Sequence, residues 1–287
     1  MICDLTSFTT GFCDRLRQIT FCAALGHYRG DRTVAVRTEL TADCPYDFVS
    51  LIRLRGFELT EANGTEPGPV RMTWRDSFPL LENVKKHRPA DLAVTDAEFL
   101  AQWIRSYQCV EIHPRLQARL DAVTERGPKL GLHVRRTDMM GKPDRLDERQ
   151  VKEIDRLIER GLRRMRRTPE YQAVFLAADD GENKRQWASR LAEMGYDCVF
   201  NPAQFDRTKM RQTSGEDFVL DLFGLARCDA IVAGGPSGVY YAACWINGRT
   251  ALLSYDQFRR FYALRKLART VLDRVPRKPT HSGPITA

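Results

Sequence analysis

The sequence predicts an α/β protein with mainly parallel strands. Short apolar runs alternate with helical patterns, most regularly after residue 128, and such alternation is typical of parallel strands covered by helices on both faces. Charged or glycine-rich segments follow three of these runs directly, where the strands would end. With 287 residues, of which 43% are hydrophobic, the chain is long enough for one large domain or two of moderate size.

The first half begins with a strand, a loop, a helix and a second strand. Residues 2–5 predict the first strand, and an apolar face predicts a helix that begins near Phe12 and is closed by Gly26 and Gly30. Residues 33–36 predict the second strand. The glycine-bearing loop before the helix can present backbone N–H groups to an anion, although most strand–helix turns bind nothing.

The remainder of the first half is less regular. Short β-rich pieces stand at 57–60 and 70–74 between turns rich in glycine and proline, and the basic run 85–88 is expected to be a solvated loop. Two helical patterns follow at 95–107 and 114–125.

A helix-breaking segment, Thr124–Pro128, separates the two halves. We therefore expect an N-terminal lobe of residues 1–127, a C-terminal lobe of residues 128–275 and a disordered tail over 276–287. In the second half, strands are expected at 129–135, 172–177, 197–200, 230–233 and 250–253. Helices are expected near 151–165, 183–194 and 216–227, from Gly238 to about Trp245, and over 256–272.

Composition narrows the class of partner. The formal net charge is +8, from 45 basic and 37 acidic residues, which favours nucleotides, nucleic acid or an anionic membrane face. The eight cysteines show no CxxC spacing, which argues against a zinc site. The first residues lack the pattern of a secretory signal, and no apolar run approaches the roughly 18–20 residues that cross a bilayer. We expect a cytoplasmic protein, with peripheral contact to the inner membrane face left open.

Arg135 and Arg136 follow the apolar run 130–134, where the polarity of the sequence changes abruptly. If this run is a parallel strand, both guanidinium groups lie at the ligand crevice, and such groups bind phosphate oxygens in a bidentate manner. The alternative is that both are ordinary surface arginines paired with nearby acids.

Two further strand ends carry polar residues that would share this crevice. Asp179 and Asp180 follow one strand, and the turn Gly234–Gly238 follows another. Ser237 precedes a helix, where unpaired N–H groups and the helix dipole attract phosphate. The same serine is equally suited to capping that helix without any ligand.

Asp221 and His133 are polar residues in apolar surroundings. Asp221 lies within the apolar helical pattern 218–225, and a buried carboxylate must be paired or hydrogen-bonded. Its partner is either a donor from the site, such as the N1–H and N2–H edge of guanine or an arginine, or a basic residue of the protein in an internal salt bridge. His133 lies inside a strand and is either a packed histidine that orients its neighbours or a general base.

Arginines crowd the polar face of the helix expected at 151–165. They are Arg156, Arg160, Arg163, Arg164, Arg166 and Arg167. A solvated helix face accounts for them, and contact with acidic lipid or an acidic acceptor is the functional alternative.

Taken together, these motifs resemble the GDP-fucose-dependent fucosyltransferases of the α1,6 and nodulation type and the related protein O-fucosyltransferases. The segment 133–138, HVRRTD, is similar to the H-x-R-x-x-D core motif of that family, and 175–180 resembles its second motif. Residues 221–229 and the turn at 236–238 resemble the third. Residues 10–16 resemble the family's N-terminal glycine-rich turn, with Cys13 in place of a glycine, whereas residues 40–95 match nothing.

The resemblance implies a GT-B architecture, in which two Rossmann-like lobes face each other and the C-terminal lobe holds the nucleotide sugar. It also implies inverting, metal-independent transfer of fucose from GDP-fucose to a glycan or glycoconjugate hydroxyl, without a cofactor. Arg135 is the expected main contact to the pyrophosphate, whose developing charge it would stabilise. The other expected donor-binding residues are Gly11, Asp14, Arg15, His133, Arg136, Asp179, Asp180, Asp221, Ser237 and Gly238.

The acceptor base is the least defined of these roles. Family members of the α1,6 type carry an acidic residue shortly after the core motif, but Pro143 occupies that register here. Asp144, one step away from that register, is the first candidate and Asp138 the second. Whichever residue serves must reach the acceptor hydroxyl directly or through one water.

Three rival functions stay open. The first is a GT-B enzyme that uses another nucleotide sugar. The second is a catalytically silent nucleotide- or glycan-binding relative, and the third is a basic nucleic-acid-binding protein. The last is disfavoured because the sequence shows no recognisable nucleic-acid-binding module beside its charge.

Overall fold

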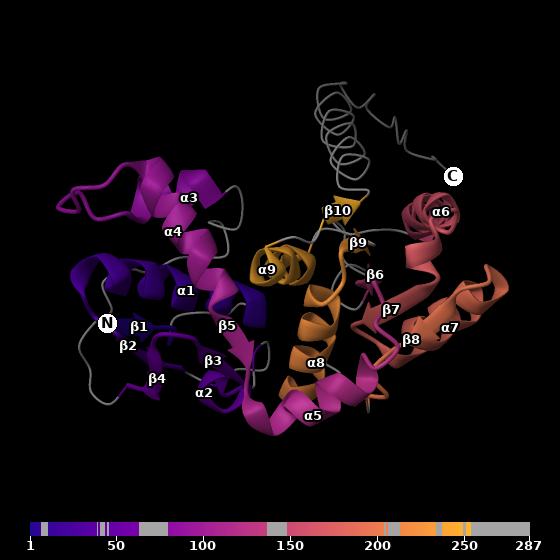
Figure 1. Cartoon of the computed structure of the whole chain (residues 1–287), viewed down its shortest axis with the longest axis horizontal. Coiled ribbons are helices and arrows are strands. Elements are labelled where there is room, and N and C mark those ends of the chain that lie inside the picture. The colour runs from indigo at the N-terminus through magenta and orange to yellow at the C-terminus, as the bar shows by residue number, and fades with distance from the viewer. Residues whose placement is uncertain are drawn as a thin grey trace, which may run out of the picture.

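The computed structural model of the chain is a mixed α/β structure with two separate parallel sheets (Figure 1). It describes residues 1–6, 11–38, 40, 44, 46–62, 80–136, 148–203, 205, 213–233, 237–248 and 251–253. Several predictions, namely the strand piece at 70–74, the helix over 256–272 and the tail over 276–287, lie outside the described residues.

The first sheet has the order β1-β2-β4 and is parallel throughout. Its strands are β1 (Ile2–Asp4), β2 (Thr33–Arg37) and β4 (Glu58–Glu61). Helix α1 (Phe12–Arg29) connects β1 to β2 and ends at Gly30, whose φ of 72° suits a left-handed cap. Gly26 does not end the helix as expected. It lies one turn earlier, where a Cβ would stand 2.8 Å from the carbonyl oxygen of Asp31.

The rest of the first half contains four helices and a small antiparallel pair among the described residues. The helices are α2 (Phe48–Leu51), α3 (Leu80–His87), α4 (Asp96–Gln108) and α5 (Pro114–Val123). Strand β3 (Ile52–Leu54) pairs with β5 (Val110–Ile112). The loop expected at 85–88 is wrong for its first three residues, which form the last turn of α3. Basic side chains are favourable there because they face the negative end of the helix dipole.

The second sheet has five strands in the order β10-β9-β6-β7-β8. All of them are parallel, as the alternating pattern predicted. The strands are β6 (Leu130–Val134), β7 (Ala173–Ala178), β8 (Asp197–Val199), β9 (Ala230–Ala233) and β10 (Ala251–Leu253). All five residues of β6 are buried, because β6 is the central strand and helices cover both of its faces.

One face of this sheet packs against α6 (Glu148–Met165) and α7 (Gly181–Glu193), and the other against α8 (Gly215–Ala226) and α9 (Gly238–Asn247). Side chains alternate between the faces, so Leu132 joins the α6–α7 core while its neighbour His133 faces the opposite side. A short 3₁₀ turn, Pro169–Tyr171, leads from α6 into β7. The alternation of side chains along β6 thus directs His133 toward the α8–α9 layer, where the candidate site lies.

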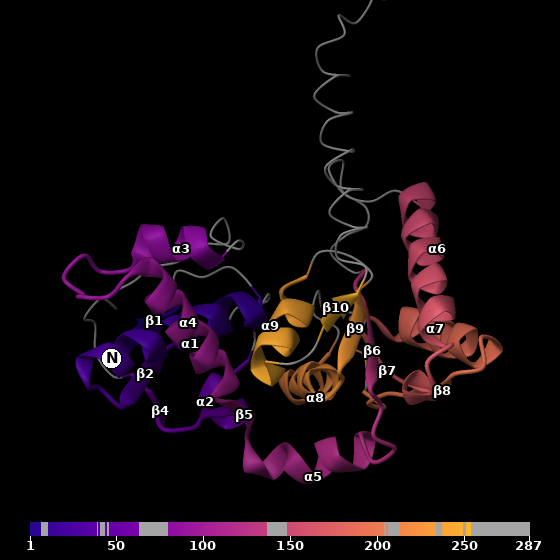
Figure 2. The same cartoon turned by 45° about the horizontal axis from the view of Figure 1, so that its top comes forward.

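The α8–α9 layer joins the two halves of the molecule (Figure 2). Helix α9 packs against α1 and α4 of the first half, and α8 packs against α5 and α2. One continuous hydrophobic core therefore includes side chains from both halves. The division into lobes of residues 1–127 and 128–275 stays a prediction. Among the described helices, none is both long and apolar enough to span a bilayer.

Candidate functional site

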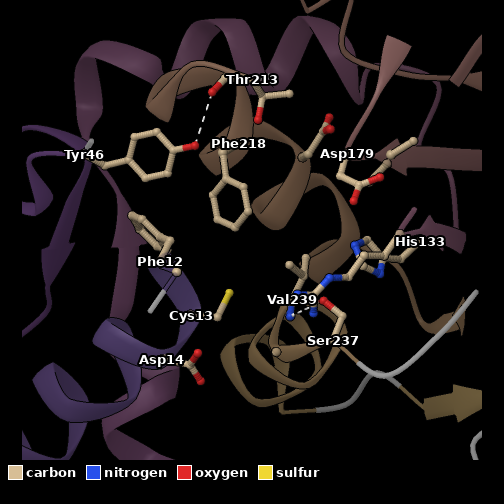
Figure 3. Close-up of a pocket in the computed structure, with 16 residues that line it drawn as sticks. Phe12, Cys13, Asp14, Tyr46, His133, Asp179, Thr213, Phe218, Ser237 and Val239 are labelled. Atoms are coloured by element: carbon tan, nitrogen blue, oxygen red, sulfur yellow. Dashed lines mark hydrogen bonds between the residues drawn. The ribbon is translucent and has the colours of Figure 1, made fainter. Parts of the chain in front are cut away.

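A cavity lies where the carboxyl ends of β6 and β7 meet the N-termini of α1 and α9 (Figure 3). About 850 Å³ of space that no atom fills belongs to it, including space that opens to solvent. It is lined by Gly11–Asp14, Tyr46, His133, Arg135, Ala177–Asp179, Thr213, Phe218, Asp221 and Ser237–Val239. Strand β6 pairs with β7 on one side and with β9 on the other, so strands that follow it in the sequence lie on both sides of it. Ligands of open α/β sheets bind at such topological switch points.

Two helix N-termini lie side by side at this cavity. Gly11 is the N-cap of α1 and Ser237 is the N-cap of α9. The helices approach so closely that a Cβ at Gly238 would stand 3.0 Å from the Cβ of Cys13. Because each N-terminus carries a partial positive charge and unpaired N–H groups, the pair forms an environment that favours an anion.

Ser237 combines both roles that its sequence position suggested. Its hydroxyl accepts a hydrogen bond from the backbone N–H of Val239 at 3.2 Å, so it caps α9. It also lines the cavity, as does Gly238 beside it. The cap orients the first turn of α9, whose residues Gly238 and Val239 line the cavity.

The adjacent arginines Arg135 and Arg136 have different positions. Arg135 lines the cavity. Arg136 is buried and does not, because its guanidinium turns to the carboxylate of Asp155 on α6. Its backbone N–H donates to both carboxylate oxygens of Asp179, at 2.9 and 3.0 Å. Arg136 therefore ties the ends of β6 and β7 together, and only Arg135 of the pair is placed against the cavity.

Asp179 and Asp180 also separate. Asp179 lines the cavity and is held by Arg136. Asp180 is the N-cap of α7, where its carboxylate accepts from the backbone N–H groups of Glu182 at 2.7 Å and Asn183 at 3.2 Å. It does not line the cavity.

Asp221 lines the cavity from α8 and forms an internal salt bridge, one of the alternatives that the sequence left open. The ammonium group of Lys184, on α7, donates to its two carboxylate oxygens at 3.0 and 3.3 Å. Burial raises the pKa of Asp221 to about 6, and the charge of Lys184 limits that rise. Only 7% of Asp221 is exposed.

Sequence reasoning missed Lys184 although the sequence carries a signal for it. The buried residues of α7 are Gly181, Lys184, Trp187 and Leu191, which follow the spacing of one helix face. A lysine on an otherwise buried face must have a partner within the fold, because an unpaired buried charge is strongly unfavourable.

An aromatic wall on the opposite side of the cavity was also not predicted. Phe218 of α8 lies 5.1 Å from the ring of Phe12 and 5.9 Å from that of Tyr46, between ring centroids. The hydroxyl of Tyr46 donates to the backbone carbonyl of Thr213 at 3.2 Å (Figure 3). The cavity thus has a polar side at the strand ends and an apolar side at the junction of the two halves.

The remaining predicted residues divide three ways. Gly11, Asp14 and His133 line the cavity, and Asp14 lies 3.6 Å from the guanidinium of Arg17. Arg15 is fully buried in α1 and does not line it. Asp138 and Asp144, the two candidates for the acceptor base, lie outside the described residues.

The described residues contain no group of three or more His, Cys, Asp or Glu side chains that could hold a metal ion. On α6, the side chains of Arg156, Arg160, Arg163 and Arg164 are exposed, as a solvated face requires. Contact of this face with acidic lipid or an acidic acceptor stays a prediction, as does the cytoplasmic location.

No protein-family profile and no curated protein sequence matches this chain. Solved structures do match. The chain is similar to a NodZ α-1,6-fucosyltransferase co-crystallised with GDP, with a TM-score of 0.52 at 16% sequence identity, over 84% of this chain and 90% of that one. NodZ from Bradyrhizobium matches with a TM-score of 0.51. The chain has a fucosyltransferase-like fold.

A second type of fucosyltransferase structure supports the same fold. POFUT1 in complex with GDP matches with a TM-score of 0.50 at 8% identity, over 88% of this chain and 97% of that one. These matches confirm the expected α/β class with mainly parallel sheets and a GT-B-like arrangement. At such low identity they show the fold alone, so the activity must be argued from this chain's own cavity.

Proposed function

We propose that this protein is a glycosyltransferase that moves fucose from GDP-fucose to a hydroxyl group of a glycan or glycoconjugate. The observation that carries the proposal is the shared cavity, which brings Arg135, Asp221 and Ser237 together from three segments far apart in the sequence. The solved structures with this fold include fucosyltransferases bound to GDP. The cavity offers the guanidinium of Arg135 and backbone N–H groups to a diphosphate. It also offers the carboxylate of Asp221 to the guanine ring of the nucleotide.

The proposed reaction is a single displacement that inverts the anomeric centre. The acceptor oxygen attacks the anomeric carbon as the bond to the β-phosphate oxygen breaks, the acceptor proton passes to a base, and GDP leaves. Negative charge develops on the departing diphosphate, where the guanidinium of Arg135 and the N-termini of α1 and α9 would stabilise it. Metal-independent transfer is part of this proposal, because these fixed groups would supply the charge stabilisation that a divalent cation supplies elsewhere.

Asp144 and, second, Asp138 are the proposed acceptor bases. Both are carboxylates shortly after Arg136 in the sequence, and a base is required within one hydrogen bond or one water of the acceptor hydroxyl.

The test is calorimetric titration with GDP, GDP-fucose, GDP-mannose and UDP-GlcNAc in the presence of a chelator. We expect selective binding of the guanine nucleotides. Arg135→Ala should weaken GDP binding about 10- to 150-fold, since a hydrogen bond to a charged group contributes roughly 1.5–3 kcal/mol. Arg163→Ala is the matched control, because Arg163 is an exposed arginine on α6 and does not line the cavity.

Equal indifference to all four nucleotides would overturn the proposal. Release of fucose from GDP-fucose without an acceptor then separates an enzyme from a nucleotide-binding relative. Selective binding of UDP-GlcNAc would instead assign the cavity to a different donor.

A further inference from the structure

The carboxylate of Asp221 has a demanding position at the base of the cavity. It is almost fully buried, lines the cavity, and belongs to a helix whose other buried residues, apart from Asp217, are apolar. Two events could satisfy it there: protonation, which removes the charge, or pairing with a cation, which keeps it. The choice matters because the two forms offer different hydrogen bonds to a ligand.

Lys184 is placed so that pairing prevails. Its ammonium group is itself buried, donates to both oxygens of Asp221, and donates a third hydrogen bond to the backbone carbonyl of Asn201 at 3.2 Å. The same group lies 5.5 Å from the centre of the Phe205 ring. All three donor positions of the ammonium are thereby directed at fixed acceptors, so the lysine cannot swing away without leaving its charge buried and unpaired.

A second carboxylate nearby, that of Asp217, opposes the effect of Lys184 on the pKa of Asp221 and has a cationic partner of its own. Asp217, one turn earlier on α8, raises the pKa of Asp221. Its own oxygens accept from Arg119 of α5 at 2.9 Å, the hydroxyl of Ser214 at 2.9 Å and the amide of Asn201 at 3.1 Å. Lys184 is therefore left to Asp221, while the guanidinium of Arg119 serves Asp217.

We propose that Lys184 is a positioning residue that keeps Asp221 ionised at the cavity wall, so that its carboxylate accepts the paired N–H donors of a guanine base and sets the pH range of nucleotide binding. This inference rests on the proposed function. An ionised carboxylate offers two acceptor oxygens, which match the N1–H and N2–H groups of guanine, whereas a protonated carboxyl presents a donor in place of one acceptor. Lys184 thus acts through Asp221 and need not touch the ligand.

Two charged groups act directly on Asp221, namely Lys184 of α7 and Asp217 of α8. The other charged or titratable groups that line the same cavity are His133 and Arg135 at the end of β6, Asp179 at the end of β7, Cys13 and Asp14 of α1, and Tyr46. Of these, Lys184 is the one that donates hydrogen bonds to the Asp221 carboxylate within the described part of the chain. Because its positive charge lowers the pKa of Asp221, removal of Lys184 must move that pKa further up.

The experiment is titration calorimetry of the full chain with GDP, inosine diphosphate and ADP between pH 5 and pH 9. In the wild type, GDP binding should weaken as the pH falls through about 6, where Asp221 becomes protonated. Lys184→Met should move this midpoint upward, so that GDP binding is weak at neutral pH and recovers at higher pH. Lys184→Arg should restore most of the wild-type profile, because it keeps the charge.

Arg185→Met is the matched control. Arg185 is the next residue on the same helix and is exposed, so its loss should leave the pH profile unchanged. The terminal phosphate of GDP, whose second pKa is roughly 6, titrates in the same range. The same nucleotide is used with every variant, so this contribution cancels when profiles are compared.

Inosine diphosphate lacks the N2 amino group and reports the second hydrogen bond. Wild type should prefer GDP to inosine diphosphate about tenfold or more at pH 8, and this preference should vanish at pH 5 and in Asp221→Asn. If Lys184→Met does not fold, as circular dichroism would show, the profiles of Lys184→Arg and Asp221→Asn still test whether this carboxylate governs the midpoint.

The outcomes separate the two proposals. A wild type that binds no guanine nucleotide at any pH contradicts the proposed function itself. A wild type that selects GDP, combined with a Lys184→Met profile that is lower at every pH but has the same midpoint, contradicts only the role of Lys184, because a purely structural effect does not move a titration.

Discussion

Two glycines show how single residues set the packing beneath the site. A Cβ at Gly224 of α8 would stand 2.1 Å from the ring of Phe175 on β7, and a Cβ at Gly131 of β6 would stand 2.8 Å from Leu225. Because each glycine lacks a Cβ, a bulky side chain of the facing element packs directly against its backbone. This close approach sets the distance between α8 and the sheet, and hence the position of Asp221 at the cavity.

Gly224→Ala should destabilise the protein by about 1–3 kcal/mol, because the added methyl group forces the buried Phe175 ring to move. The measurement is the urea midpoint of unfolding. Gly161→Ala on α6 is the control, since a Cβ there meets nothing within 4 Å. It should stabilise the helix by up to about 1 kcal/mol. Equal effects of the two substitutions would contradict this packing.

At the scale of secondary structure, the carboxylate of Asp155 joins three elements, namely α6, α7 and the end of β6. Asp155 of α6 accepts from the guanidinium of Arg136 at the end of β6 and from that of Arg190 on α7, the latter at 3.0 Å. Through Arg136 it also reaches Asp179 on the cavity wall. Helix α6 therefore supports the site although it does not line the cavity.

Asp155→Ala should cost about 3–5 kcal/mol of stability, because the buried guanidinium of Arg136 loses its ion pair with Asp155. Glu153→Ala, on the same helix, breaks only the exposed ion pair with Arg156 and should cost no more than about 1 kcal/mol. Chemical denaturation of both variants gives the comparison. A small, equal loss in both would show that Arg136 does not depend on Asp155.

At the scale of the whole molecule, the α8–α9 layer belongs to both halves. Its side chains lie in one hydrophobic core with those of α1 and α4. Ion pairs cross the same junction, from Arg119 to Glu216 and from Arg227 to Asp121, both at 2.6 Å. These pairs are exposed and contribute little, so the shared apolar core is the main link between the halves.

We expect one cooperative unfolding transition. Trp103 is fully buried in the first half and Trp187 is nearly so in the second, so each reports on its own half once the other three of the four tryptophans are replaced. Two variants that keep only Trp103 or only Trp187, with Phe at the other three positions, should each give coincident fluorescence and circular dichroism curves in urea. Fluorescence and circular dichroism midpoints that separate would show that the halves unfold independently.

Much of the fold follows from local sequence patterns. The strands at 130–134 and 230–233 and the helices around them were predicted because hydrophobic periodicity is a local property. The short elements α2, β3 and β5 were not, because runs of three or four residues are formed by their pairing partners and not by their own pattern.

The candidate site divides in the same way. The sequence by itself determined which strands end in Arg135, Asp179 and the turn before Ser237, because the carboxyl ends of parallel strands must lie at one edge. Only the tertiary structure decided that Arg136 turns to Asp155 and that Lys184 pairs with Asp221. Those partners belong to different helices, and the packing of helices on a sheet brings together side chains that no sequence spacing relates.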